Sequence, residues 1–140
     1  DEDTMYRAMA LSDLTTIHQK TPIGRLSAYC GAVSAGAGSG AGIAYLSGAS
    51  YDEVVHTVIN AVAIISGMVC DGAKASCAAK IAEAVDAGII GYMAKRGQNF
   101  DDGDGIVTAG IEATIRNVGR LAKEGMKETN DEIISIMIGS

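Results

Sequence analysis

Large aromatic side chains are scarce in this chain, which has no Trp, one Phe and five Tyr among its 140 residues. Glycine, at 18 residues, and other small side chains must fill much of the interior, so the elements have to approach one another closely. Basic residues are also few, and 11 Lys and Arg against 17 Asp and Glu give a net charge of −6. That balance argues against nucleic acid and against an anionic membrane surface as partners.

Cysteine is rare as well, with three residues, an odd number that does not suit a disulfide framework. The chain opens at Asp1 without a Met and without a basic segment followed by an apolar one, so we see no signal peptide. We expect a piece of a longer cytoplasmic protein. Its thiols are then reduced core residues, metal ligands or both.

Two uncharged stretches, Leu26–Tyr51 and Val54–Cys70, invite comparison with membrane spans. The first contains overlapping Gly-x-x-x-Gly patterns at Gly36–Gly40 and Gly38–Gly42, which serve close helix packing in membranes and elsewhere. Its residues are mostly Gly, Ala and Ser, however, and these gain little from hydrocarbon. The second is short and carries polar groups. The sequence therefore predicts packed helices and no membrane partner.

Apolar residues recur at helical spacing along the chain, and no stretch alternates with period two. This pattern predicts an all-α fold for residues 1–140, a single compact bundle of about five or six helices around a buried Gly/Ala-rich central helix. Pro22 is expected to open the second helix, while Ser50–Glu53 and Thr129–Glu132 have capping-box spacing. The predicted helices are 3–19, 23–46, 51–69, 73–95, 106–125 and 132–138, with Gly97 ending the fourth.

The residues with the clearest chemical potential are Cys30, Cys70 and Cys77. Cys70 is predicted to end one helix and Cys77 to lie two turns into the next, with the flexible Asp71-Gly72 between them. Three thiolates can hold a four-iron cluster by three of its irons and leave the fourth open as a Lewis acid. Glycines nearby would let the backbone pack around such a cluster. Buried cysteines serving only as small apolar side chains are the competing interpretation, because this spacing is no generic zinc or ferredoxin pattern.

The segments Ile23–Ala32 and Gly67–Lys80, with their Cys-Asp-Gly-Ala-x-x-Ser-Cys block, resemble the C-terminal part of the L-cysteine desulfidase family. That group includes proteins designated UPF0597 and is similar to the α domain of iron–sulfur L-serine dehydratases. The resemblance implies a cluster-binding domain of a longer enzyme, with Cys30, Cys70 and Cys77 as ligands of a four-iron four-sulfur cluster. The spacing of the last two cysteines is closer to the desulfidase branch.

The resemblance further implies a lyase that converts L-cysteine, or L-serine, to pyruvate, ammonia and sulfide or water. In that family an N-terminal region of the same protein supplies the rest of the active site, including a further cysteine proposed as acid/base. We therefore expect these residues alone to be inactive, and we assign no catalytic residue among them. The sequence does not decide whether the protein forms a homodimer. The alternative is a helical interaction or oligomerisation module with purely structural cysteines.

Several polar residues are weaker candidates for binding substrate. Asp71 and Lys74 flank the cysteines and could orient the amine and carboxylate of an amino acid, although a helix-start acid and a solvated lysine explain them equally well. Ser76 could donate a hydrogen bond, and Arg25 could pair with a carboxylate. His18 and His56 have no Cys or Asp at metal-ligand spacing, and no Ser-His-Asp arrangement or phosphate loop is found.

Overall fold

The computed structural model describes residues 1–94, 100 and 105–139, and within these ranges it contains helices and no strand. This confirms the predicted all-α class. The elements are α1 (Glu2–Ile23), α2 (Gly31–Leu46), α3 (Tyr51–Ile65), α4 (Cys77–Ala94), α5 (Ile111–Arg120), the π-helical turn η1 (Leu121–Gly125) and α6 (Lys127–Ile138).

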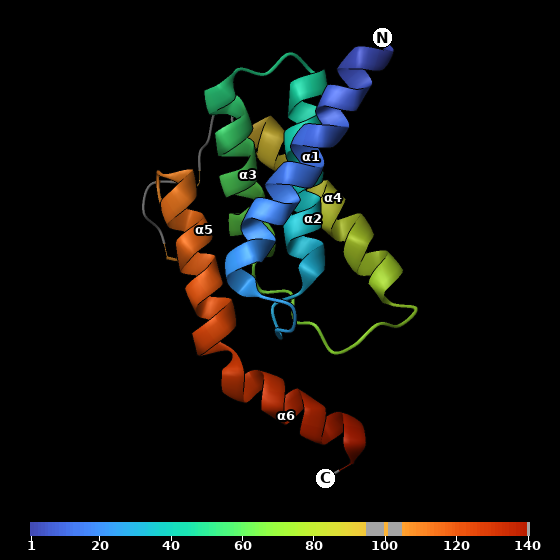
Figure 1. The fold of residues 1–140 in the computed structure, drawn as a ribbon, viewed down its shortest axis with the longest axis vertical. Coiled ribbons are helices and arrows are strands. Elements are labelled where there is room, and N and C mark those ends of the chain that lie inside the picture. Colours follow the sequence, from blue (N-terminus) through green and yellow to red (C-terminus); the bar gives the residue numbers. More distant parts are fainter. Residues whose placement is uncertain (95–99, 101–104, 140) are drawn as a thin grey trace.

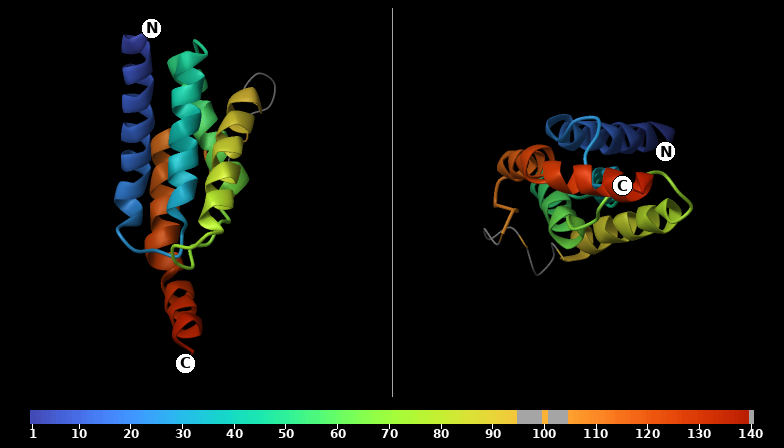
Figure 2. Two further views of the ribbon diagram at one scale, coloured as in Figure 1. Left: turned by 90° about the vertical axis from the view of Figure 1, so that its right-hand side faces the viewer. Right: turned by 90° about the horizontal axis from the view of Figure 1, so that it is seen from below.

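Helix α2 occupies the middle of the bundle, between α1 and α4 (Figure 2, left). Helix α3 packs against α2 and α4, and α5 packs against α1 and α3. The connections at 24–30 and 66–76 meet at one end of the bundle, where η1 also leads into α6 (Figure 1). Helix α6 projects beyond that end and buries none of its residues.

The glycines of α2 explain why this helix can be central. Gly36 and Gly40 face α4, and a β-carbon on Gly40 would lie only 2.8 Å from the Cα of Gly88. Gly38 and Gly42 face α1, and a β-carbon on Gly38 would lie 2.1 Å from Oγ1 of Thr16. Each glycine pair lets a neighbouring helix approach, which confirms the predicted Gly/Ala-rich core helix. The expectation that glycines near the cysteines let the backbone pack around a cluster stays a prediction.

The remaining core comes from one face of each neighbouring helix. Helix α3 buries Thr57–Val62. Helix α5 and the turn after it bury Ile115, Val118 and Ala122. The Ser50 hydroxyl accepts from the Glu53 N–H at 3.4 Å, and the Glu53 carboxylate accepts from the Ser50 N–H at 2.7 Å. This confirms the first predicted capping box.

The predicted second helix begins too early. Pro22 lies in the last turn of α1, and Gly24, with φ of +90°, ends that helix by donating its N–H to Lys20. Helix α2 starts only at Gly31, and the chain between bends at residues 25, 26 and 28 before it becomes extended at Cys30. The reason is tertiary: part of this segment pairs with residues 68–70, a partner that local spacing does not reveal.

Other helix ends also differ from prediction. Helix α3 ends at Ile65 and α4 begins at Cys77, so the turn predicted at residues 70–72 extends over residues 66–76, and residues 66–69 and 73–76 are not helical as predicted. The predicted end of the fourth helix at Gly97 lies outside the described residues.

Near the C-terminus, α5 starts at Ile111 because the Thr108 N–H bonds to the Thr114 hydroxyl at 3.0 Å and fixes a turn before the helix. The second predicted capping box is wrong. Helix α6 begins at Lys127, directly after η1, so Thr129 lies inside the helix.

Candidate functional site

A short antiparallel bridge brings two of the cysteines together at the end of the bundle. Tyr29 pairs with Val69 in this bridge. On either side of the pair, the Cys30 N–H donates to the Met68 carbonyl at 3.1 Å, and the Cys70 N–H donates to the Ala28 carbonyl at 2.7 Å. Two cysteines 40 residues apart in the chain are thus held by hydrogen bonds between their own segments.

The bridge also determines which way the two thiols point. Side chains alternate along extended chain, so Cys30 and Cys70 project on the face opposite to Tyr29 and Val69. They are diagonal neighbours across the pair, a relation that separates residues by about 7–8 Å. Cys30 is 8% exposed and belongs to the core, while Cys70 is half-buried and packs against it. Cys70 was predicted to end a helix. It lies instead in the extended segment beside the bridge.

Cys77 approaches from the other side of the loop. Cys77 was predicted to lie two turns into a helix. It is instead the first residue of α4. Its Sγ lies 3.7 Å from the Gly72 carbonyl oxygen, and its N–H donates to the Lys74 carbonyl at 2.9 Å. The loop between Cys70 and Cys77 consequently folds back on itself, with Gly72 in a left-handed conformation at φ +94°.

Lys80, one turn into α4, connects these parts and was missed as a site residue in the sequence. Its ammonium donates to the Val69 carbonyl at 2.8 Å and to Oδ1 of Asp71 at 3.1 Å. The hydrogen bond with Asp71 raises the pKa of Lys80, and negative charge on Cys30 and Cys77 raises it further. The available signal was its position three residues after Cys77, which places both on one helix face.

Asp71 is held by two lysines. Its carboxylate binds the Lys74 ammonium as well as Lys80. These hydrogen bonds, with Lys74 as the larger contributor, lower the pKa of Asp71 to about 2. The predicted substrate contacts Asp71 and Lys74 are therefore paired with each other in this structure, and their proposed role toward substrate stays a prediction.

The other predicted substrate contacts lie at the edge of this region. Ser76 is exposed, and its backbone carbonyl accepts the Lys80 N–H at 3.1 Å. Arg25 is exposed beside the end of α1 and lines a surface hollow with Lys20 and Gly24. No contact in the described residues joins Arg25 to a cysteine.

Tyr29, next to Cys30, has an uncommon environment. The residue is 1% exposed, and its hydroxyl is buried without a hydrogen-bond partner in the described part of the chain. Burial raises the pKa of this phenol, and charge on Cys30 adds to the effect. The Tyr29 hydroxyl is thus a buried donor without an acceptor among the described residues.

The donor set determines which metal group would fit. Across residues 1–94, 100 and 105–139, no three His, Cys, Asp or Glu side chains gather closely enough for a single metal ion. A four-iron cluster is wider than an ion and takes thiolates as ligands. Cys30, Cys70 and Cys77, on three segments tied together by the bridge and by Lys80, fit such a cluster in chemistry and in topology.

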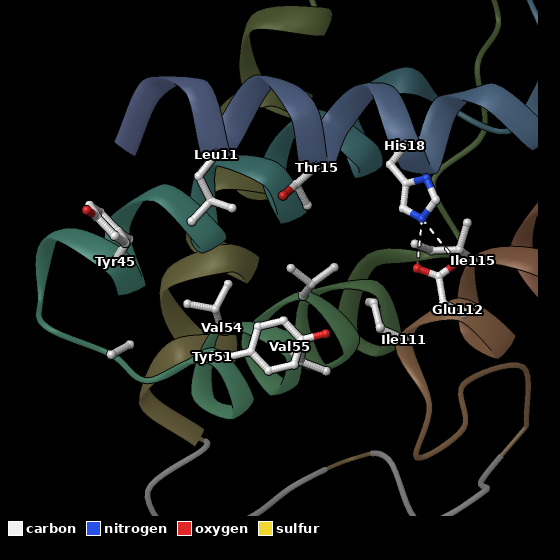
Figure 3. Close-up of a pocket in the computed structure, with 12 residues that line it drawn as sticks. Leu11, Thr15, His18, Tyr45, Tyr51, Val54, Val55, Ile111, Glu112 and Ile115 are labelled. Atoms are coloured by element: carbon white, nitrogen blue, oxygen red, sulfur yellow. Dashed lines mark hydrogen bonds and ion pairs between the residues drawn. The ribbon is translucent and has the colours of Figure 1, made fainter. Parts of the chain in front are cut away.

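A separate apolar pocket lies among α1, α3 and α5, with a volume of about 430 Å³ (Figure 3). Nε2 of His18 bonds to Oε1 of Glu112 at 2.9 Å on its rim. Leu11, Val54 and Ile111 project into it from three different helices. None of the cysteines lines this pocket, so it is distinct from the site at the end of the bundle.

The helices in the described residues were also compared with the requirements of a membrane span. Each is either too short or insufficiently apolar to cross a bilayer. The Gly-x-x-x-Gly patterns of α2 are accounted for by packing against α1 and α4.

Comparison with known proteins gives the relationships of the chain. The family model described as the serine dehydratase alpha chain matches residues 1–135. A UPF0597 protein of Desulfitobacterium hafniense is 65% identical over 138 residues, which cover 98% of this chain and 32% of that protein. UPF0597 proteins of Lachnoclostridium phytofermentans and Finegoldia magna are 55% and 53% identical, each match covering 99% of this chain and 33% of the relative.

The chain thus spans about a third of the length of these relatives. No solved structure matches it significantly. The family match over nearly the whole chain confirms the resemblance predicted from the two cysteine segments, as far as UPF0597 proteins and the dehydratase α domain are concerned. The chain belongs to the serine dehydratase alpha-chain family.

Proposed function

We propose that these residues form the cluster-binding part of an iron–sulfur lyase acting on L-cysteine, with L-serine as the second candidate substrate. The observation that carries the proposal is that a bridge joins the segments of Cys30 and Cys70 at the end of the bundle where Cys77 begins α4. Membership of a dehydratase family supports the same reaction class. Reduced thiols suit a cytoplasmic location.

The role of this chain is to present three thiolates. When bound, a four-iron cluster on three protein ligands supplies one iron free to act as a Lewis acid toward a leaving group or carboxylate. The buried Cys30 and the half-buried Cys70 and Cys77 would hold it against the apolar core. The bridge at Tyr29 joins the segments of Cys30 and Cys70, and the loop at Gly72 connects Cys70 to Cys77.

The proposed reaction removes the Cα proton of L-cysteine and breaks the Cβ–S bond, so that sulfide leaves with the bonding electrons. The resulting aminoacrylate takes a proton at Cβ to give the imine of pyruvate, and water hydrolyses that imine to pyruvate and ammonia. We assign the base to the N-terminal region of the full-length protein. Without that region, the 140 residues alone are expected not to convert substrate to product.

Substrate contacts from this chain remain part of the proposal. Arg25 carries a guanidinium suited to a carboxylate, and Ser76, exposed beside Cys77, carries a hydroxyl able to donate. Asp71 and Lys74 would have to exchange their mutual pairing for contacts with the substrate amine and carboxylate. An N-terminal region of the same protein, and a second copy, are the protein partners we expect.

The experiment is anaerobic reconstitution of the full-length protein with iron and sulfide. We expect close to one four-iron cluster per chain by iron and acid-labile sulfide analysis, a broad visible absorption band, and release of sulfide and pyruvate from L-cysteine. Serine in place of each of Cys30, Cys70 and Cys77 should lower the cluster content and the activity together.

The contrary result is specific. Reconstituted protein with intact thiols but no bound iron would end the proposal and favour the interaction module with structural cysteines. In that case Cys70→Ser and Cys77→Ala would cost only packing energy. The activity assay with L-serine decides between the two substrates, because water and not sulfide is then the second product.

A further inference from the structure

The loop that carries Cys70 is fastened to α4 through one ammonium group. The Nζ of Lys80 donates to the Val69 carbonyl at 2.8 Å and to Asp71 at 3.1 Å, so it binds the residues on both sides of Cys70. Its side chain is 24% exposed, whereas that of Lys74, the other partner of Asp71, is 48% exposed. Lys80 thus reaches from the first turns of α4 back to the bridge.

We propose that Lys80 is a positioning residue of the three-cysteine site, which fixes the Cys70 segment onto α4 and sets a permanent positive charge beside the thiolates. The inference rests on the proposed function, since it concerns the ligands of the cluster. Among the described residues, the Lys80 ammonium bonds to Val69 and Asp71 and to no thiol. It acts through the positions of Cys70 and Cys77.

The mechanical part of the inference follows from topology. Cys30 and Cys70 are held to each other by the bridge, whereas Cys77 belongs to α4 and is joined to Cys70 only through the loop. A loop containing Gly72 is flexible unless something ties it down. Lys80 ties the Cys70 end directly to the helix that begins at Cys77, so all three sulfurs keep fixed relative positions.

The electrostatic part follows from charge. Three thiolates and a cluster gather negative charge in a partly buried place, and the net charge near a cluster helps set its reduction potential. A fixed cation nearby favours the more negative, reduced state. Removing the charge of Lys80 should therefore lower the potential, and replacing it by arginine should restore most of the difference.

The test compares Lys80→Met, Lys80→Arg and Lys74→Met in the full-length protein. Lys74 is the matched control because its ammonium also binds Asp71. Among the described residues, that ammonium forms no hydrogen bond with Val69 or with α4. In the cluster-free protein, Lys80→Met should speed hydrogen exchange of the Cys70 amide about tenfold, the effect of losing one charged hydrogen bond. Lys74→Met should change it less.

After reconstitution, Lys80→Met should hold several-fold less iron and sulfide than wild type, and the clusters that remain should have a lower midpoint potential. Lys80→Arg should recover both properties. Circular dichroism checks that each variant keeps its helices, and the uncharged variant Lys80→Gln serves as the test if the methionine variant does not fold.

The outcomes separate the two proposals. A wild-type protein that takes up no cluster removes the proposed function, and the ligand-positioning inference falls with it. A wild-type protein with a cluster, beside a Lys80→Met variant with the same content, potential and amide exchange, overturns the inference and leaves the proposed function standing. Equal effects of Lys74→Met and Lys80→Met also overturn it.

Discussion

Gly36 lies so close to Ala84 that a β-carbon on the glycine would stand 2.2 Å from the alanine's carbonyl oxygen. The obstacle is backbone, which cannot swing aside as a flexible side chain could. The contact between α2 and α4 at this point therefore depends on the missing methyl group. It is the clearest example of how small residues hold the bundle together.

Gly36→Ala should lower the free energy of unfolding by about 3 kcal/mol, because overpacking a rigid interface forces the helices apart. Gly31→Ala is the matched control in the same helix, since nothing lies within 4 Å of its β-carbon position. That variant should be neutral or up to about 1 kcal/mol more stable through helix propensity. Urea unfolding of both variants measures the difference, and similar effects would contradict the interpretation of the interface.

Ser50→Ala should destabilise the protein by about 1 kcal/mol, because the hydroxyl caps the Glu53 N–H at the start of α3. Ser39→Ala is the control, since Ser39 lies inside α2 and its hydroxyl bonds only back to Ala35 along the same helix. Thermal unfolding should show a lower midpoint for the first variant alone. A loss as large in the control would show that the capping box contributes little.

A structural feature could be predicted from the sequence where neighbouring residues in the chain determine it. The Ser50–Glu53 box and the glycine pattern of α2 are local signals, and both predictions are confirmed. The ends of α2 and α3 are not local, because Tyr29 becomes extended by pairing with Val69, 40 residues away. Helical spacing alone could not reveal that pairing, so both helices were predicted too long.

Asp71 should contribute to stability in a pH-dependent way. Its two lysine partners lower its folded-state pKa from 3.8 to about 2. A carboxyl with a depressed folded pKa stabilises the native state fully above its unfolded pKa, and loses that contribution as the pH falls from about 4 toward 2. The stability difference between wild type and Asp71→Asn should thus be constant near neutrality and shrink over that interval.

Denaturant unfolding at a series of pH values measures this difference, and subtraction removes the titration of the other carboxyl groups. A difference that persists unchanged at the acid end of the series would show that Asp71 acts by something other than its charge. Lys80→Met in the same series should show a smaller acid dependence than wild type, because one of the two cations that lower this pKa is gone.

Gly72→Ala should cost roughly 1–2 kcal/mol, because an L side chain is strained at φ +94°. The new β-carbon would also lie 3.1 Å from the terminal methyl of Met137 in α6, a group that can move. Combining the change with Met137→Ala separates the causes. If backbone strain dominates, the double variant stays destabilised relative to Met137→Ala, and full recovery would instead identify the contact with α6.

The sequence analysis named the three cysteines of the candidate site but not the lysine that holds the loop between them. Cys30, Cys70 and Cys77 could be named from spacing and resemblance, although their role as ligands stays a prediction. Lys80 stood inside the quoted segment and was passed over, because a lysine on a helix is usually a solvated charge. Only the folded-back loop brings its ammonium to Val69 and Asp71, and the sequence predicted a shorter turn, at residues 70–72 alone.

Helices α2 and α3 form a hairpin, and the bridge between Tyr29 and Val69 joins the two chain segments at its open end. Two of the three cysteines directly follow the bridged residues. The third thiol starts the neighbouring helix. A group gripped by all three sulfurs would act as a cross-link between hairpin and helix, restricting the unfolded chain as a disulfide does. Loss of the group would remove that restriction from the unfolded chain, while the packing of α2 against α4 would remain in the folded one.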